Sequence, residues 1–345
     1  MSKPDGLEDT AGGVGGAEAP KADNESTRRR TALRFVAANQ WVLLLALTLV
    51  LGLITGLVNE RFFNPRNLFN ILEQTSVLGL VAAGATILII SGNFDISVGA
   101  IIGLSAVVMS MIVLAGYPEE LAMLAGVVVA VLCSVFNAIV ARAFQAPTFI
   151  VSLATIGIFT GIGLWMTAGV IQMVPNNFTF LAGTRIGGQL PLIWLISLAG
   201  YVAVGLMLKY TRVGRRTYAV GDNPRAAFLA GIDVSRTTVL LFAINGILVG
   251  LAAVVLISRI GSALPDTGAG LELRAIGAVV IGGVPITGGR GGVVGTFFGV
   301  LLLGVISNML NLLRVDPFLQ DIAFGALIVL AIGVSWLRTR VGSEG

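Results

Sequence analysis

About ten apolar segments follow one another after residue 40, and they constrain the fold more than any other feature. A helix rises 1.5 Å per residue, so about 20 apolar residues are needed to cross about 30 Å of hydrocarbon. The segment 273–284 is too short to do so alone and is predicted to be re-entrant or covered by its neighbours. The segments are 41–59, 70–91, 97–116, 121–142, 148–169, 191–209, 238–258, 273–284, 292–313 and 317–337.

The composition places the chain in a membrane. Hydrophobic residues make up 56% of it and charged residues only 12%, whereas soluble domains average about 25% charged residues. We therefore predict an all-α, polytopic integral membrane protein. The net charge of +4 comes from loop arginines and indicates orientation in a bilayer, with no nucleic-acid partner.

Most kinds of catalytic site are excluded by two residue counts. The chain has no histidine, which removes His-metal sites, His proton relays and Ser–His or Cys–His nucleophile pairs. Cys133 is its only cysteine and lies within an apolar segment. No catalytic residue, metal site or cofactor is predicted.

A basic stretch at 209–236 divides the apolar segments into two groups. Lys and Arg gather in short loops on the cytoplasmic side, so this stretch is predicted to be cytoplasmic. Its charged residues are Lys209, Arg212, Arg215, Arg216, Arg225 and Arg236 against Asp222 and Asp233.

Both termini are predicted to lie on the same side. Residues 1–34 contain few large apolar side chains and end in a group of arginines, so they are predicted to form a disordered cytoplasmic tail. Residues 339–345 form a second cytoplasmic tail if ten segments cross. If 273–284 does not cross, Arg338 and Arg340 move outside, which the charge rule disfavours.

A short helix is predicted in the middle of the basic stretch. Asn223 is suited to cap it, Pro224 suits its first position, and Gly231 stops it. Two readings are open: this helix is a surface on which a soluble partner docks, or the loop only sets the topology.

Three Gly-rich stretches interrupt the apolar segments, at 91–100, 261–275 and 282–295. Irregular backbone near membrane depth persists only where protein or a water-filled cavity covers it. Asp95 and Ser97, in the first stretch, either cap the following helix or contact a solute. Glu272 and Arg274 either pair with each other or line an entrance.

Uncharged polar residues within the segments offer a path for a hydroxyl-rich solute, or else hold helices together. Asn137, Asn245, Asn308 and Asn311 are of this kind. The residues predicted to line the path are Asn93, Asp95, Ser97, Gly99, Asn308 and Asn311.

Five ordered stretches resemble the permease subunits of bacterial ATP-binding-cassette importers for pentoses and related sugars, the ribose-type branched family. The resemblance covers about residues 35–338, predicted to be one permease domain. The family's usual Gly-Gly-Ile-Asp here has Asn93 and Phe94 before Asp95, so no particular sugar is predicted. The stretches are GNFDISVGA (92–100), PTFIVSLATIGIFTG (147–161), TYAVGDNPRAAFLAGI (217–232), GAGLELRAIGAVVIGG (268–283) and GGRGGVVGTFFGVLLLGVISNMLNLL (288–313).

The resemblance implies a subunit of the bacterial inner membrane that moves a small sugar-like solute inward. Its implied partners are a cytoplasmic ATPase, an extracytoplasmic solute-binding protein and a second permease copy. The loop 209–237 would couple it to the ATPase. The coupling residues so implied are Gly221, Asp222, Asn223, Ala226, Ala227, Ala230 and Gly231.

The alternative function is a self-sufficient secondary transporter of a small polar solute. Such a carrier would need a ladder of embedded acids or histidines, which the sequence lacks. The chain also lacks the G-x4-G-K-[ST] motif, so ATP would have to be hydrolysed by a separate subunit.

Overall fold

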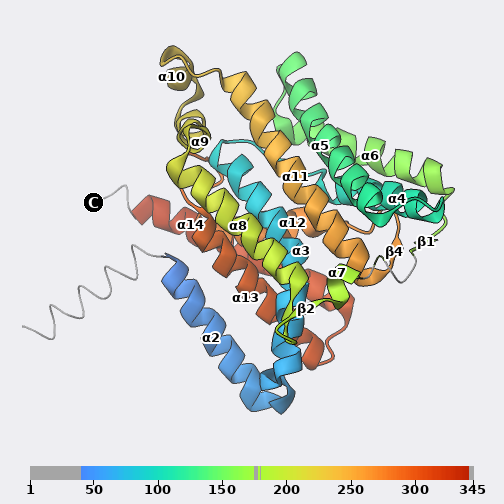
Figure 1. Ribbon diagram of the computed structural model, residues 1–345. Coiled ribbons are helices and arrows are strands. Elements are labelled where there is room, and N and C mark those ends of the chain that lie inside the picture. The colour runs from blue at the N-terminus through green and yellow to red at the C-terminus, as the bar shows by residue number, and fades with distance from the viewer. Residues whose placement is uncertain (1–39, 175–177, 179, 342–345) are drawn as a thin grey trace, which may run out of the picture. The chain divides into compact units, whose positions relative to one another are not determined.

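The structure is a computed structural model and describes residues 40–174, 178 and 180–341 (Figure 1). Helices account for most of these residues, which confirms the predicted all-α polytopic fold. The long helices are α2 (Gln40–Val58), α3 (Pro65–Ile90), α4 (Val98–Leu114), α5 (Glu119–Ala143), α6 (Thr148–Thr167), α8 (Leu192–Tyr210), α11 (Val234–Ile260), α13 (Val293–Leu312) and α14 (Pro317–Val341). The shorter ones are η1 (Glu60–Phe63), α7 (Phe180–Gly183), α9 (Arg212–Asp222), α10 (Pro224–Leu229) and α12 (Leu271–Ile281).

Seven helices in the described part of the chain are long and apolar enough to cross a membrane: α2, α3, α5, α6, α8, α11 and α13. Two of these, α3 and α11, are mostly buried and pack against each other. α3 also packs against α8, α12 and α13, and α11 against α5. Fewer than a third of the residues in the apolar spans of α2, α5 and α6 are buried, as expected of helices that face lipid.

The boundaries of α3 follow from its sequence. The side chain of Asn64 accepts a hydrogen bond from the backbone N–H of Arg66, and Pro65 occupies the first turn. Gly92 follows the helix with φ of 76°, a left-handed conformation that ends it. The helix thus begins five residues before the predicted segment 70–91, because polar Asn64 and Pro65 start it outside the apolar run.

Two further apolar helices fall below the length of these seven. α4 has 17 residues and α12 has 11, which agrees with the prediction that the segment 273–284 cannot span alone. Both adjoin the Gly-rich stretches. Both helices are packed on by longer neighbours, since α4 packs against α5, α6 and α11, and α12 packs against α3 and α13.

Several elements outside the apolar segments were not predicted. Helix α9 begins where the Thr211 side chain accepts a hydrogen bond from the Gly214 N–H. Two short antiparallel pairs also form: β1 (Gln172–Met173) with β4 (Ser262–Ala263), and β2 (Arg185–Ile186) with β3 (Leu190–Pro191).

The structure describes only a small part of the two predicted tails. Residues 1–34 lie outside the described residues, as do 342–345. Helix α14 continues to Val341, three residues beyond the predicted end of the permease domain at 338.

Candidate functional site

A buried hydrogen-bond network surrounds Asp95, in the stretch between α3 and α4. Only 6% of Asp95 is exposed. Its Oδ1 accepts hydrogen bonds from the backbone N–H of Ser97 (3.0 Å) and from the Ser97 hydroxyl (2.6 Å). Ser97, and not Asp95, stands at the N-cap position of α4. Asp95 therefore fixes the turn that leads into the helix.

The same carboxylate also joins two long helices. Nδ2 of Asn137, on α5, donates to its Oδ1 at 3.3 Å, and Nδ2 of Asn245, on α11, donates to its Oδ2 at 3.3 Å. No basic side chain of the described residues forms an ion pair with Asp95. Neutral donors thus surround its carboxyl group, and they hold the irregular stretch between α5 and α11.

Two other predicted path residues of this stretch, Asn93 and Gly99, make different kinds of contact. Asn93 donates to the carbonyl and hydroxyl oxygens of Ser91, at 3.1 and 3.0 Å. Gly99 packs closely on Gly268 and Glu272, so a side chain at Gly99 would overlap both. The stretch before α12 therefore lies directly against the start of α4.

The other predicted path residues, Asn308 and Asn311, lie on α13 in a different part of the structure. Asn308 is buried and exchanges two hydrogen bonds with Asn67 of α3, at 3.0 and 2.8 Å. Oδ1 of Asn311 accepts a hydrogen bond from Gln320 at 3.0 Å. The six predicted residues thus form two separate groups.

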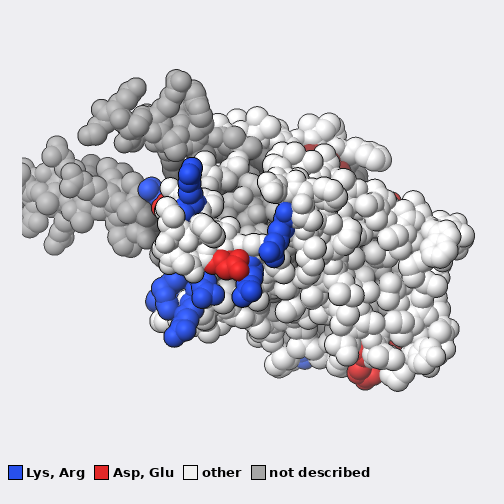
Figure 2. All heavy atoms as spheres, turned by 90° about the horizontal axis from the view of Figure 1, so that it is seen from above, with Lys and Arg blue, Asp and Glu red and all other residues white. Residues whose placement is uncertain are grey.

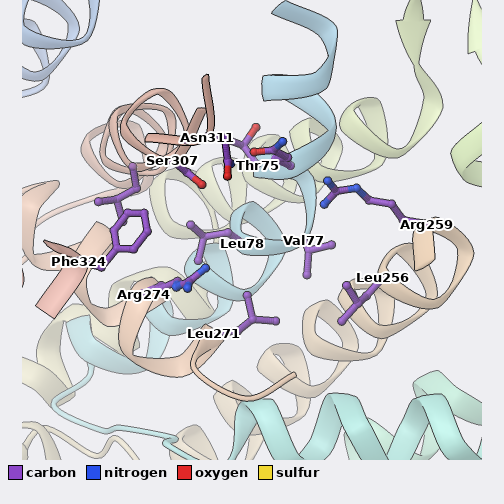
Figure 3. A pocket seen from close by; sticks show the side chains of 13 residues that line it. Thr75, Val77, Leu78, Leu256, Arg259, Leu271, Arg274, Ser307, Asn311 and Phe324 are labelled. Atoms are coloured by element: carbon purple, nitrogen blue, oxygen red, sulfur yellow. The ribbon is translucent and has the colours of Figure 1, made fainter. Parts of the chain in front are cut away.

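A cavity of about 350 Å³ adjoins Asn311 (Figure 3). Helices α3, α11, α12, α13 and α14 all contribute to it, at the end of the bundle remote from α9 and α10. Its polar lining residues are Gln74, Thr75, Arg259, Arg274, Ser307 and Asn311. Such a mixture of apolar walls with a few polar groups is typical of a small-molecule site.

The two arginines of this cavity differ in their pairing. Arg274 forms an ion pair with Asp321 at 2.6 Å, and its guanidinium lies 4.9 Å from the centre of the Phe324 ring. The expected pairing of Arg274 with Glu272 is not made, although Arg274 does line a cavity. Arg259 forms no ion pair with any described residue, and Figure 3 shows its guanidinium directed toward the cavity.

The predicted short helix in the basic stretch is present as α10. The side chain of Asn223 accepts a hydrogen bond from the Ala226 N–H at 3.0 Å, and Gly231 has φ of 83°. Ala227, however, is only 4% exposed and faces its own chain. The exposed large side chains of this helix are Phe228 (68%) and Leu229 (80%).

Helix α9 ends in a tight backbone junction with the end of α3 and with the Gly-rich stretch 282–295. Gly221 packs so closely on the carbonyl of Ile90, at the end of α3, that a Cβ there would overlap the oxygen. The N–H of Gly289 donates to the same carbonyl at 2.8 Å. Gly289 also packs on the backbone of Asp222. The last turn of α9 therefore contacts both the end of α3 and the stretch 282–295.

Tyr218 adds a side-chain contact to this junction. Its hydroxyl donates to the carbonyl oxygen of Gly291 at 2.9 Å. Partial burial raises the pKa of the Tyr218 phenol above its ordinary value, which favours the protonated form that can donate.

Arg259, Tyr218, Phe228 and Leu229 were not among the predicted site residues. The sequence could have indicated Phe228 and Leu229, because they are large apolar residues in an otherwise polar loop. For Arg259 the only sequence signal is a charge at the end of an apolar segment, which interfacial arginines share.

The helices and their two ends define the class of the protein: a polytopic membrane protein with a polar cavity toward one end and a basic, helical surface at the other (Figures 1 and 2). Residues 67–332 match the family described as the branched-chain amino acid transport system / permease component. The chain belongs to this family of transport-system permeases and is a multi-pass protein of the bacterial inner membrane.

Curated relatives cover most of the chain. The ribose import permease protein of Bacillus subtilis is 37% identical over 287 residues, which cover 82% of this chain and 88% of that protein. The fructose import permease protein of Rhizobium meliloti is 33% identical, over 88% of this chain and 86% of that protein. The autoinducer 2 import system permease protein of Yersinia enterocolitica is 34% identical, over 90% and 86%. No solved structure matches the chain significantly.

Proposed function

We propose that this permease subunit passes a small sugar or sugar-like solute inward through the cavity beside Arg259, driven by ATP hydrolysis in a separate subunit. The observation that carries the proposal is a polar cavity of about 350 Å³ lined by a guanidinium that forms no ion pair with a described residue. Arginine offers five N–H donors, and a hydroxyl-rich solute offers matching acceptors. The names of the relatives, which include ribose and fructose permeases, support this solute class.

The predicted path residues receive different roles in this proposal. Asn311 lines the cavity and Asn308 lies on the same helix, so both are proposed to line the solute path. The stretch that holds Asn93, Asp95, Ser97 and Gly99 is proposed to shape the path further along, with Asp95 fixing its position.

The ATPase and the solute-binding protein are proposed to bind at opposite ends of the helix bundle. The ATPase is proposed to dock on α9 and α10, and a solute-binding protein is proposed to deliver solute to the end with the cavity. A second permease copy completes the assembly. The chain itself is proposed to catalyse no reaction and to need no cofactor.

Reconstitution tests the function directly. Liposomes that contain the chain with its ATPase and binding protein should take up labelled ribose or fructose only when ATP is supplied. The chain alone should give neither counterflow nor gradient-driven uptake. Uptake by the chain alone would instead support the alternative, a secondary transporter.

We expect Arg259→Gln to lower ATP-driven uptake by about tenfold. A hydrogen bond from a charged donor contributes about 1.5–3 kcal/mol, and 1.4 kcal/mol corresponds to a factor of ten. The measurement is initial uptake rate per unit of membrane-inserted protein. Arg66→Gln is the matched control, because Arg66 is exposed and does not line the cavity. Equal rates for both variants would remove Arg259 from the solute path.

Reporter fusions test the proposed orientation. A fusion at Asp222 should report the cytoplasm, and one at Asp266 the opposite side, because the basic residues then lie inside. A fusion at Ser343 should also report the cytoplasm. An external signal at Asp222 would overturn the arrangement, and an external signal at Ser343 would mean that α12 does not complete a crossing.

A further inference from the structure

An apolar groove of about 400 Å³ runs between α8 and α13, separate from the cavity beside Arg259. Its walls are formed by aliphatic and aromatic side chains. They include Leu198, Val202, Leu206, Val293, Val294 and Phe297. Val202, Leu206 and Val294 are each more than half exposed, so the groove is open along its length.

A glycine and an aromatic pair give the groove its depth. Gly205 lines it, and a Cβ at this position would lie 3.2 Å from Cγ2 of Val293. The rings of Tyr201 and Phe297 meet edge to face, with centroids 5.3 Å apart. The rings form a packed wall, and the missing side chain at Gly205 leaves the space open.

The end of the groove nearest α9 is basic. Lys209 and Tyr210 line it, and Nζ of Lys209 lies 5.1 Å from the centre of the Tyr210 ring. Exposed Arg212 and Arg215 follow in the first turns of the next helix, α9. None of these three cations forms an ion pair with a described residue. Figure 2 shows basic side chains gathered on this end of the molecule.

We propose that this groove binds one anionic phospholipid, with an acyl chain between α8 and α13 and the phosphate beside Lys209 and Arg212. The basic end of the groove, with its tyrosine, would lie beside the phosphate of such a lipid. The apolar part that follows would lie beside its acyl chain. Lysine, arginine and tyrosine lie at the headgroup level of membrane proteins, and basic residues there attract anionic lipids.

Charge complementarity favours a lipid over a second copy of the chain as the occupant. A second copy packed on this groove through the described part of its chain would have to bring acidic side chains to the level of Lys209. Within the basic stretch only Asp222 and Asp233 are acidic, and Asp233 already pairs with Arg236 at 3.1 Å.

Lipid binding to the purified full chain in neutral detergent tests this proposal. Native mass spectrometry would compare phosphatidylglycerol, which is anionic, with phosphatidylcholine, which has no net charge. We expect the wild type to retain phosphatidylglycerol preferentially. Lys209→Gln should weaken that retention by about fivefold, which is the contribution of one basic residue near an anionic surface, and should leave phosphatidylcholine unchanged.

A second pair of variants tests the apolar part. Gly205→Leu should reduce the binding of both lipids, because its side chain fills the groove. Gly325→Leu is the control, since no atom lies within 4 Å of an added Cβ at that exposed helical position. Equal retention of the two lipids by the wild type would overturn the proposal. So would efficient cross-linking of Val202→Cys between two copies in a Cys133→Ser background, which would identify the groove as a protein interface.

Discussion

Replacing Gly221 by alanine is expected to abolish most of the coupling between ATP hydrolysis and uptake, while the chain still inserts and still binds its ATPase. An added Cβ would overlap the carbonyl oxygen of Ile90, which also accepts the hydrogen bond from Gly289. Overpacking costs about 1–3 kcal/mol, and a coupling free energy of that size corresponds to about 5- to 150-fold. The junction of α9 with the end of α3 and with the stretch 282–295 would be displaced.

The measurement is solute-stimulated ATPase activity and uptake in the reconstituted complex, together with copurification of the ATPase. Gly325→Ala serves as the control, because that glycine also lies in a helix and its Cβ would meet open space. Normal coupling in Gly221→Ala would show that motion does not pass through this junction. Loss of copurification would show that the change acts on docking instead.

Replacing Leu229 by aspartate is expected to prevent the ATPase from docking. Leu229 is 80% exposed on α10 and neighbours Phe228, which is 68% exposed, so the two offer an apolar contact on an otherwise polar loop. Removal of a central apolar contact in an interface costs about 2 kcal/mol or more, and 1–2 kcal/mol corresponds to a factor of about 5–30. Copurification should therefore fall about 30-fold.

Phe144→Asp is the matched control for this variant. Phe144 is 78% exposed in the turn between α5 and α6, away from α10. Its replacement adds the same charge without touching the proposed docking surface. If Leu229→Asp copurifies the ATPase as well as Phe144→Asp does, α10 only sets the topology and the partner docks elsewhere.

The apolar helices could be predicted because length and hydropathy are local properties. The segment 148–169 corresponds to α6, and the segment 292–313 to α13, within two residues at each end. Helix α9 could not be predicted in this way. Its polar, basic sequence has no apolar run, and its buried residues, Thr217 and Val220 among them, are buried only because the helix packs on neighbours from other parts of the chain.

The sequence indicated some residues of the site but not the residues that they contact. Asp95 was predicted either to cap a helix or to contact a solute, but its partners Asn137 and Asn245 are 42 and 150 residues away, so only the fold brings them together. The coupling role implied for Ala226, Ala227 and Ala230 depended on which side of α10 faces the rest of the chain. Ala227 turned out to be buried, because α10 packs against α9 and α11.

The shortness of α12 has a consequence for how the protein is made. Its 11 residues rise only about 16 Å, roughly half of the hydrocarbon thickness. The unpaired backbone at its ends tolerates lipid only when covered, and α13, which packs against it, is synthesised later. We therefore expect α12 to become stable in the bilayer only once α13 has emerged and packed against it beside α3, so that the insertion of these two helices is coupled.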